Sequence, residues 1–311
     1  MQVFSGSSNI DLAKKIAKLM ATSSSDANVA GMEISTFANG ETRVWVKEKR
    51  IEKSVVVVQS LSSPTNEHLI EFCLICDALH RGGATEITAV IPWMGYSKQD
   101  KVFRVGEPLS AKVVAQIIQV ARPSKIITVD LHNRATLGFF DVPIVELSAK
   151  PILLDYFKKK WSMVNGQWSN NVVVVAPDAG AVKASTAFAM ELGVGVVYVD
   201  KRRDLASGEV EVIRMSGEVR DRDILMIDDN VFTGSTLLAT AKELKKAGAK
   251  TIRVGLTHHL YVPGVQEKIE GSEIDEMVVT DTVAMVNGQW SMVNGKLKIL
   301  SVAGLIVDEI K

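Results

Sequence analysis

Two adjacent carboxylates, Asp228 and Asp229, follow the apolar run ILMI at 224–227, where we expect a parallel strand to end, and precede a hydroxyl-rich turn, Thr233-Gly234-Ser235-Thr236. The amides and hydroxyls of such a turn can surround a phosphate at the positive end of the helix that it opens. Two neighbouring acids suit the hydroxyls of a sugar or a metal ion. A helix N-cap would explain one of the hydroxyls but not both acids. We therefore predict a sugar-phosphate site at 228–236.

A short cationic segment, Lys201-Arg202-Arg203, ends another apolar run at 194–200. In an extended strand, alternation sends Lys201 and Arg203 to one side and Arg202 to the other. Cations placed in this way could stabilise a phosphate that carries developing negative charge. Three basic residues taken alone are more often a solvated turn, so the pattern does not by itself assign a catalytic role.

Two further polar side chains lie where parallel strands are expected to end. His132 follows the run IITVDL at 126–131, and Asp178 follows VVVVA at 172–176. In open α/β sheets, ligands bind at the carboxyl edge of the strands, which is where both residues are expected. A lone histidine is more often structural than a ligand, and its spacing alone does not change that interpretation.

Three other patterns have simpler explanations than chemistry. His258 and His259 are adjacent on an expected strand, where neighbouring side chains point apart, so we discount them as a metal pair. Cys73 and Cys76 lie in a segment with helical spacing and no second cysteine pair, which favours buried helix thiols over a metal or redox site. MVNGQW occurs at 163–168 and at 285–290, and an Asn-Gly pair between apolar residues is typical of surface hairpins or loops.

Short β-branched runs alternate with helical patterns along the whole chain. VVVVQS at 55–60 precedes a helical pattern over about 66–81, and ITAVIPW at 87–93 precedes another over about 108–120. This alternation is typical of a parallel, doubly wound sheet with helices on its faces. The alternation starts again after residue 147, so we predict two tandem α/β domains, 1–147 and 148–311, with the last helix packing on the first domain.

The composition argues against a nucleic-acid or membrane partner. The 36 basic side chains equal the 36 acidic ones, so no net field draws the 311-residue chain to an anionic surface. The longest apolar runs are far shorter than the ~20 residues that cross a bilayer. The first residues, MQVFSGSSN, have no basic and apolar succession of the kind found in secretory signals. We therefore expect a cytoplasmic protein.

Several longer motifs extend the sugar-phosphate loop into a pattern that covers essentially the whole chain. Through them the chain resembles ribose-phosphate pyrophosphokinases, the phosphoribosyl pyrophosphate synthetases, which have the type I phosphoribosyltransferase fold. The resemblance implies transfer of the β,γ-diphosphate of ATP to the C1 hydroxyl of ribose 5-phosphate, giving phosphoribosyl pyrophosphate and AMP with Mg²⁺ as cofactor. The motifs are FSGSSN at 4–9, FANGE at 37–41, VVQS at 57–60, AVIPWMGYSKQDK at 89–101, EPLSAKVVA at 107–115, ITVDLHN at 127–133, GFFDVP at 138–143, APDAG at 176–180 and VDKRR at 199–203.

The resemblance also implies roles for individual residues. It makes Lys201 and Arg203 the transition-state clamps, His132 a ligand of magnesium and of the nucleotide, and Asp178 an acid near a second magnesium. Asp228, Asp229 and the loop that follows would bind the ribose and its phosphate. The implied ATP-binding residues are Phe37, Asn39, Glu41, Lys98, Gln99, Asp100 and His132, and the implied sugar-phosphate residues are Asp228, Asp229, Phe232, Thr233, Gly234, Ser235 and Thr236.

In the family, residues matching Phe37, Asn39 and Glu41 complete the adenine pocket of a neighbouring subunit. The resemblance therefore implies a homo-oligomer, from dimer to hexamer.

The chain departs from the family pattern at several positions. Lys98 replaces the arginine of an Arg-Gln-Asp motif, so the planar fork that binds phosphate with two hydrogen bonds is lost. Val102, Phe103 and Gly106 stand where charged residues are common. Phe232 replaces an aspartate inside the phosphate loop, and a phenyl ring can stack on a group beyond the 5-phosphate.

Phe232 leaves an alternative open, in which the same diphosphate transfer uses a larger 5-substituted ribose such as ADP-ribose. A second alternative is a non-catalytic, synthetase-like regulatory subunit, although the retained Lys201, Arg203, His132 and Asp178 argue against it. A phosphoribosyltransferase would share the loop but would have no use for a duplicated domain.

Overall fold

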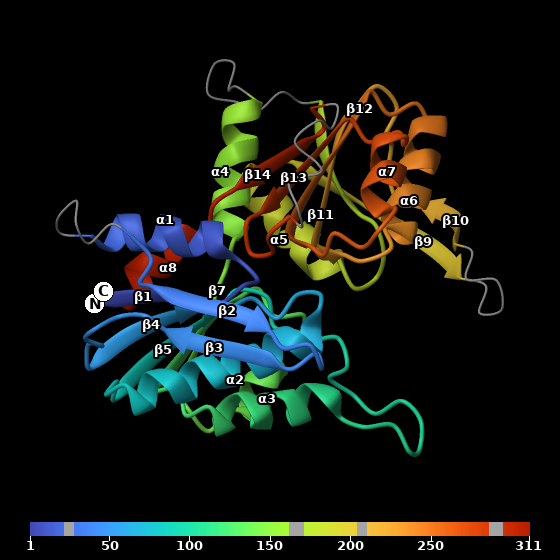
Figure 1. The fold of residues 1–311 in the computed structure, drawn as a ribbon. Helices are drawn as coiled ribbons and strands as arrows, with labels where there is room; N and C mark the ends of the chain where they lie inside the picture. The colour runs from blue at the N-terminus through green and yellow to red at the C-terminus, as the bar shows by residue number, and fades with distance from the viewer. Residues whose placement is uncertain (22–27, 162–170, 204–209, 286–294) are drawn as a thin grey trace. The chain divides into compact units, whose positions relative to one another are not determined.

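The computed structural model describes residues 1–21, 28–161, 171–203, 210–285 and 295–311, and at 201–203 and 210–213 it describes the backbone alone. The chain forms two compact units, each with its own sheet (Figure 1). The first comprises Met1–Ser148, Asp281–Ala284 and Ser301–Lys311, and the second comprises Ala149–Thr280 and Met285–Leu300. The expected α/β class with parallel sheets is confirmed. The MVNGQW segments fall outside the described residues, apart from Met285.

The first unit is built on a five-stranded parallel sheet in the order β1-β4-β5-β6-β7. A separate antiparallel hairpin joins β2 and β3. The strands are β1 (Gln2–Ser5), β2 (Met32–Thr36), β3 (Thr42–Val46), β4 (Ser54–Val58), β5 (Glu86–Ile91), β6 (Lys125–Val129) and β7 (Ile144–Leu147).

Helices cover both faces of this sheet. Helices α2 (Thr65–Arg81) and α3 (Ser110–Val120) bury Phe72 and Ile118 against one face. On the opposite face α1 (Ile10–Met20) packs on β1 and β4 and against α8 (Ala303–Ile310), as Figure 1 shows. The side chain of Asn9 caps α1 by accepting a hydrogen bond from the amide of Leu12 at 3.3 Å. A short 3₁₀ helix, η2 (Arg134–Phe139), connects β6 to β7.

Both cysteines lie in α2, as the helical spacing predicts. Cys76 is buried and Cys73 is half-buried, and both thiols are free. Burial raises the pKa of each thiol, so a smaller fraction of each cysteine is present as the reactive thiolate.

The second unit has a seven-stranded sheet in the order β10-β9-β8-β11-β12-β13-β14. All neighbours are parallel except β10, which runs antiparallel to β9 at the edge. The strands are β8 (Val172–Ala176), β9 (Gly195–Arg203), β10 (Val210–Met215), β11 (Asp223–Val231), β12 (Thr251–His259), β13 (Glu276–Thr280) and β14 (Leu297–Leu300).

Successive residues of β11 enter different cores, which shows that this sheet is also covered on both faces. Met226 packs with Leu237 and Ile269, from α6 (Ser235–Lys246) and α7 (Val265–Glu270). Leu225 packs with residues of α4 (Lys150–Lys160) and α5 (Val182–Leu192). Strand β9 lies on one side of β8, and the chain then returns so that β11 lies on the other side of β8. The strand order therefore reverses at β8. Ligands of doubly wound folds bind at such a switch point.

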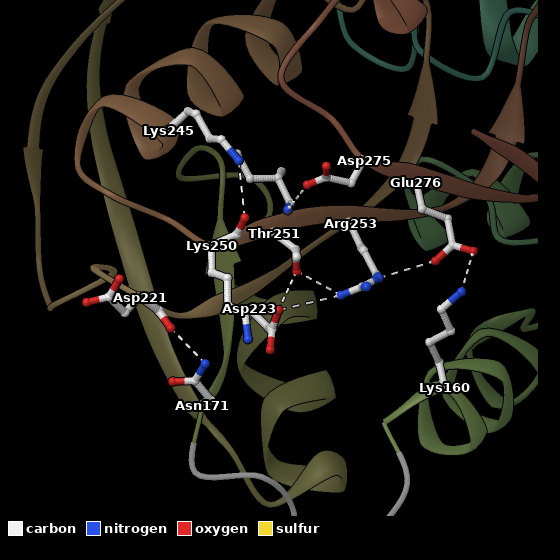
Figure 2. Close-up of polar contacts among 11 residues, drawn as sticks. Lys160, Asn171, Asp221, Asp223, Lys245, Lys250, Thr251, Arg253, Asp275 and Glu276 are labelled. Carbon is white, nitrogen blue, oxygen red and sulfur yellow. Dashed lines mark hydrogen bonds and ion pairs between the residues drawn. The ribbon is translucent and has the colours of Figure 1, made fainter. Parts of the chain in front are cut away.

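A polar network joins the amino-terminal ends of β11, β12 and β13 (Figure 2). Arg253 donates to the Thr251 hydroxyl at 2.8 Å and forms ion pairs with Asp223 and Glu276 at 3.8 and 3.3 Å. Its guanidinium also lies 5.4 Å from the ring centre of Trp161. The network lies at the end of the sheet away from the carboxyl edge, so we interpret it as a structural anchor.

No helix among the described residues has both the length and the apolar content needed to cross a membrane.

Candidate functional site

The predicted sugar-phosphate acids lie at the switch point of the second unit. The expectation that Asp228 and Asp229 follow the end of a strand is wrong in one respect, because β11 continues to Val231. The reason is that β11 pairs with β12 as far as Val231, whereas its pairing with β8 stops at Met226. The two acids therefore lie beyond the last β8 partner, where β11 and β8 separate.

A third carboxylate belongs to this group. Asp178 follows β8 and accepts a hydrogen bond from the amide of Ala181 at 3.1 Å, which fixes the turn into α5. The pKa of Asp228 is raised to about 7, mainly by burial and in addition by the negative charges of Asp229 and Asp178. Three acids held together in this way favour a ligand that brings hydroxyl donors or a cation.

The loop after β11 has the geometry that an anion-binding turn requires. Gly234 is the N-cap residue of α6 with φ +70°, in the left-handed region that favours glycine, so the cap position itself carries no side chain. The hydroxyl oxygens of Thr233 and Ser235 lie 3.2 Å apart. Phe232 is 41% exposed at the start of the loop. The alternative in which Thr233 or Ser235 serves as a conventional N-cap is therefore not what the structure shows.

In the first unit, two of the predicted ATP-binding segments contact each other. Lys98 and Gln99 are exposed in the turn after β5, and the side-chain amide of Asn133 donates to the carboxylate of Asp100. His132 is exposed and directly precedes Asn133. One hydrogen bond therefore joins the turn at 98–100 to the loop that carries His132.

The third predicted ATP-binding segment is the tip of the β2–β3 hairpin. The amide of Phe37 donates to the carbonyl of Glu41 at 2.8 Å, and the amide of Glu41 donates to the Asn39 side chain at 3.2 Å. Phe37 is 52% exposed, and Asn39 and Glu41 are exposed as well. The tip thus presents an aromatic ring beside a carboxylate and an amide.

The predicted catalytic cations lie at the end of β9. The backbones of Lys201 and Arg203 pair with Val212 and Val210 of β10. Their side chains lie outside the described part of the structure, so the predicted clamp stays a prediction.

Family models match both halves of the chain. The N-terminal domain of ribose phosphate pyrophosphokinase matches residues 1–121, and the phosphoribosyl transferase domain matches residues 145–287. A ribose-phosphate pyrophosphokinase from Campylobacter jejuni is 35% identical over 310 residues, which covers 100% of this chain and 94% of the relative. Another, from Burkholderia pseudomallei, is 38% identical over 309 residues, covering 99% of this chain and 92% of the relative. The chain belongs to the ribose-phosphate pyrophosphokinase family.

A solved member of the ribose-phosphate pyrophosphokinase family has the same fold. The crystal structure of phosphoribosylpyrophosphate synthetase from Mycobacterium smegmatis superposes with a TM-score of 0.86 at 30% identity, covering 99% of this chain and 97% of that one. The predicted family and the two tandem domains of the type I phosphoribosyltransferase fold are thereby confirmed.

Two further polar residues of this ribose-phosphate pyrophosphokinase family member lie at the site without having been predicted from the sequence. Asn230 is buried next to Asp229, and neither polar atom of its side-chain amide has a hydrogen-bond partner among the described residues. Glu146 in β7 accepts a hydrogen bond from the amide of Leu131, beside His132. A polar residue inside an apolar run is the signal that could have found them.

The histidine pair of this family member is deeply buried. His258 and His259 end β12, and the Nδ1 atom of His259 accepts a hydrogen bond from the amide of Tyr261 at 2.9 Å. The ring of His259 stacks on Tyr261, with centroids 4.2 Å apart. Burial lowers the pKa of His259 to about 4, so its ring is neutral at pH 7. This setting favours a packing role for His259.

Proposed function

We propose that this chain transfers the β,γ-diphosphate of ATP to the C1 hydroxyl of ribose 5-phosphate, yielding phosphoribosyl pyrophosphate and AMP. The hydroxyl oxygen attacks the β-phosphorus, the bond from that phosphorus to the α-phosphate oxygen breaks, and the hydroxyl proton is released. The observation that carries the proposal is the set of Asp178, Asp228 and Asp229 at the switch point, directly before an anion-binding turn.

On the sugar side, each group has a chemical task. The carboxylates of Asp228 and Asp229 accept hydrogen bonds from ribose hydroxyls. The amides at the start of α6 bind the 5-phosphate together with the hydroxyls of Thr233, Ser235 and Thr236. Phe232 is exposed at the start of this loop.

On the nucleotide side, the contact between Asp100 and Asn133 holds the turn at 98–100 next to His132. Lys98 pairs with a phosphate of ATP as a point charge, and Gln99 and Asp100 make further polar contacts with the nucleotide. Phe37 at the hairpin tip stacks on adenine, with Asn39 and Glu41 as its polar contacts. In the family this tip serves a second copy of the chain, so we propose a homo-oligomer.

Lys201 and Arg203 supply the positive charge that the transfer needs. Phosphoryl-group transfer offers little covalent work to a protein, so most of the acceleration comes from placement and from cations near the developing charge. Lysine and arginine that alternate with Arg202 on β9 can reach the same side of the strand.

The donor set fits Mg²⁺ held jointly by protein and substrate. Among the described residues, no three side chains of His, Cys, Asp or Glu converge on one point as a ready-made metal site. Mg²⁺ usually keeps several waters and takes phosphate oxygens with one or two protein ligands. His132 would hold one ion with the nucleotide phosphates, and Asp178 would hold a second near the sugar. When bound, Mg²⁺ neutralises phosphate charge.

The comparisons do not favour the two alternatives. The relatives are named for the phosphorylated ribose itself, which supports ribose 5-phosphate as the acceptor over ADP-ribose, and they are named as pyrophosphokinases rather than as regulatory subunits. The cytoplasmic location stays a prediction from the sequence.

The deciding experiment is to incubate the purified protein with ATP, Mg²⁺ and either ribose 5-phosphate or ADP-ribose, and to identify the products by mass spectrometry. We expect phosphoribosyl pyrophosphate and AMP in equal amounts from ribose 5-phosphate. Release of ADP, or the absence of product, would contradict the proposal. If the protein turned over ADP-ribose faster than ribose 5-phosphate, the alternative with the larger acceptor would be favoured.

Lys201→Ala should reduce turnover by about a thousandfold, as loss of a single transition-state contact often does.

A further inference from the structure

The loop that carries His132 is anchored from the neighbouring strand by one carboxylate. Glu146 lies in β7, and its Oε1 atom accepts a hydrogen bond from the amide of Leu131 at 2.9 Å. Its Oε2 atom forms an ion pair with Nε of Arg134 at 2.7 Å. The side chain of Glu146 is 10% exposed, whereas that of Arg134 is 79% exposed. The carboxylate therefore binds the backbone of Leu131, directly before His132, and the side chain of Arg134, two positions after it.

The register of the sheet explains how Glu146 reaches this loop. Strands β6 and β7 are parallel neighbours, and Glu146 lies beside Thr128 in the ladder. The amide of Asp130 donates to the carbonyl of Leu147 at 2.9 Å, which extends the pairing by one more contact. Glu146 thus starts level with Thr128, inside the sheet, and contacts the chain just after it leaves the sheet.

The backbone that leads from β6 into this loop is strained. Asp130 has φ +36°, a value that residues other than glycine rarely adopt. Such conformations persist where surrounding contacts enforce them, and they concentrate at functional sites. Here the enforcing contacts are the hydrogen bonds from Asp130 to Leu147 and from Leu131 to Glu146. The bend directs the chain into the exposed residue His132.

The other side of His132 is anchored as well. Asn133 donates to Asp100, accepts a hydrogen bond from the amide of Ala135 at 3.0 Å and accepts another from the hydroxyl of Thr136 at 2.7 Å. His132 consequently lies between two fixed residues while its own side chain is exposed. A histidine held in this way needs little reorganisation to meet a ligand.

The contacts of Glu146 do not fully compensate for its burial. Burial raises the pKa of Glu146, and the hydrogen bond from Leu131 and the ion pair with Arg134 only partly oppose that effect. A mostly buried carboxylate of this kind contributes little net stability compared with an apolar side chain of similar size. Its presence is better explained by the geometry that it imposes on residues 130–134.

We propose that Glu146, through the amide of Leu131 and the side chain of Arg134, is a positioning residue that holds His132 ready for the phosphates of the nucleotide. The inference rests on the proposed function, in which His132 contacts ATP. Substitutions of residues that orient a metal-ligating histidine, the role that the family resemblance gives His132, commonly cost about 10- to 100-fold in metal affinity or activity. The effect should fall on ATP and not on ribose 5-phosphate.

The test compares Glu146→Ala, Glu146→Gln and Arg134→Ala with the matched control Asp77→Ala. Asp77 forms an exposed ion pair with Arg81 on α2 of the same unit, at 2.7 Å, so its removal reports the general cost of losing such a pair. The KM for each substrate, kcat and the thermal midpoint are measured for every variant. We expect Glu146→Ala to raise the KM for ATP about tenfold, with the KM for ribose 5-phosphate within about twofold of wild type. Glu146→Gln, which can still accept from Leu131, should fall between.

A double-mutant cycle separates positioning from packing. If Glu146 acts through His132, adding Glu146→Ala to His132→Ala should change the KM for ATP no further. Additive effects, or a Glu146→Ala variant that affects both substrates equally, would overturn the inference. Arg134 is largely exposed, so Arg134→Ala should remain folded even if Glu146→Ala does not, and it should reproduce part of the ATP effect.

The outcomes also separate this inference from the proposed function. A wild-type protein that makes no phosphoribosyl pyrophosphate would contradict the function. A wild-type protein that makes it, while Glu146→Ala behaves like Asp77→Ala, would contradict only the inference. Calorimetric titration with a non-hydrolysable ATP analogue gives the same comparison without turnover, and there unchanged affinity in Glu146→Ala and Arg134→Ala would overturn it.

Discussion

Asp178 and Asp228, one after β8 and the other in the neighbouring strand β11, lie close enough for the charge of the first to raise the pKa of the second. The pKa of Asp228 is about 7, compared with 3.8 for an ordinary aspartate. The folded protein therefore holds a proton on Asp228 at pH values where the unfolded chain has lost it.

This difference predicts how stability depends on pH. Between about pH 4 and pH 7 the folded state binds more protons at Asp228 than the unfolded state does, so the contribution of this residue to stability falls as pH rises and is lost above the folded pKa. Asp228→Asn removes the ionisable group. The thermal midpoint of this variant should therefore exceed that of wild type by more at pH 8 than at pH 5. A difference that is constant across this range would contradict the raised pKa.

Gly234→Ala should impair the sugar-phosphate loop. Its φ of +70° costs a residue with a side chain about 1 kcal/mol, although an added Cβ would have room at ordinary contact distances. Because the loop can relieve this strain only by moving its amides, the KM for ribose 5-phosphate should rise several-fold while the KM for ATP stays constant. The control is Gly83→Ala, at φ +107° with open space around it in the first unit. It should lose stability without any change in either KM.

Arg253→Ala should destabilise the second unit. The side chain of Arg253 is 18% exposed, and its loss leaves the carboxylates of Asp223 and Glu276 without a buried cation. Breaking such a group costs about 3 kcal/mol, whereas Lys246→Ala, which removes an exposed pair with Glu243, should cost less than about 1 kcal/mol. Denaturant unfolding measures both. Equal losses in the two variants would show that the network of Figure 2 anchors nothing.

Lys98→Arg should tighten ATP binding. A guanidinium can form two parallel hydrogen bonds with a phosphate, whereas the ammonium of Lys98 acts as a point charge. Since Lys98 is exposed in the turn after β5, the longer arginine has room. We expect the KM for ATP to fall by about threefold, and to rise by about tenfold in Lys98→Ala. An unchanged KM in both variants would remove Lys98 from the nucleotide site.

Local patterns predicted the elements of the fold well. The helix expected over about 66–81 is found at Thr65–Arg81, because its apolar residues recur at helical spacing and Gly82 follows its end. The end of β11 was misplaced, because whether a strand continues past two acids depends on its neighbour β12, and the sequence of β11 alone does not contain that information.

The candidate site was predicted only in part. Asp228 and the loop after it carry a local signal, as do the ATP-binding segments, once the family pattern is considered. Glu146 carries only the weak signal of one acid in the apolar run VPIVEL, which gives no hint that its side chain reaches an amide in the loop after β6. The side chains of Lys201 and Arg203 lie outside the described residues, so their predicted role awaits the activity assays.

The assignment of Asp281–Ala284 and Ser301–Lys311 to the first unit has a consequence for biosynthesis. Helix α8, which packs against α1, is synthesised after α1 and after the second unit. Nascent domains commonly fold in order from the amino terminus, but here α1 gains its partner α8 only after the second unit has been synthesised. A polypeptide that terminates before α8 would leave uncovered the part of α1 that α8 contacts, which would mark it for chaperones and proteases.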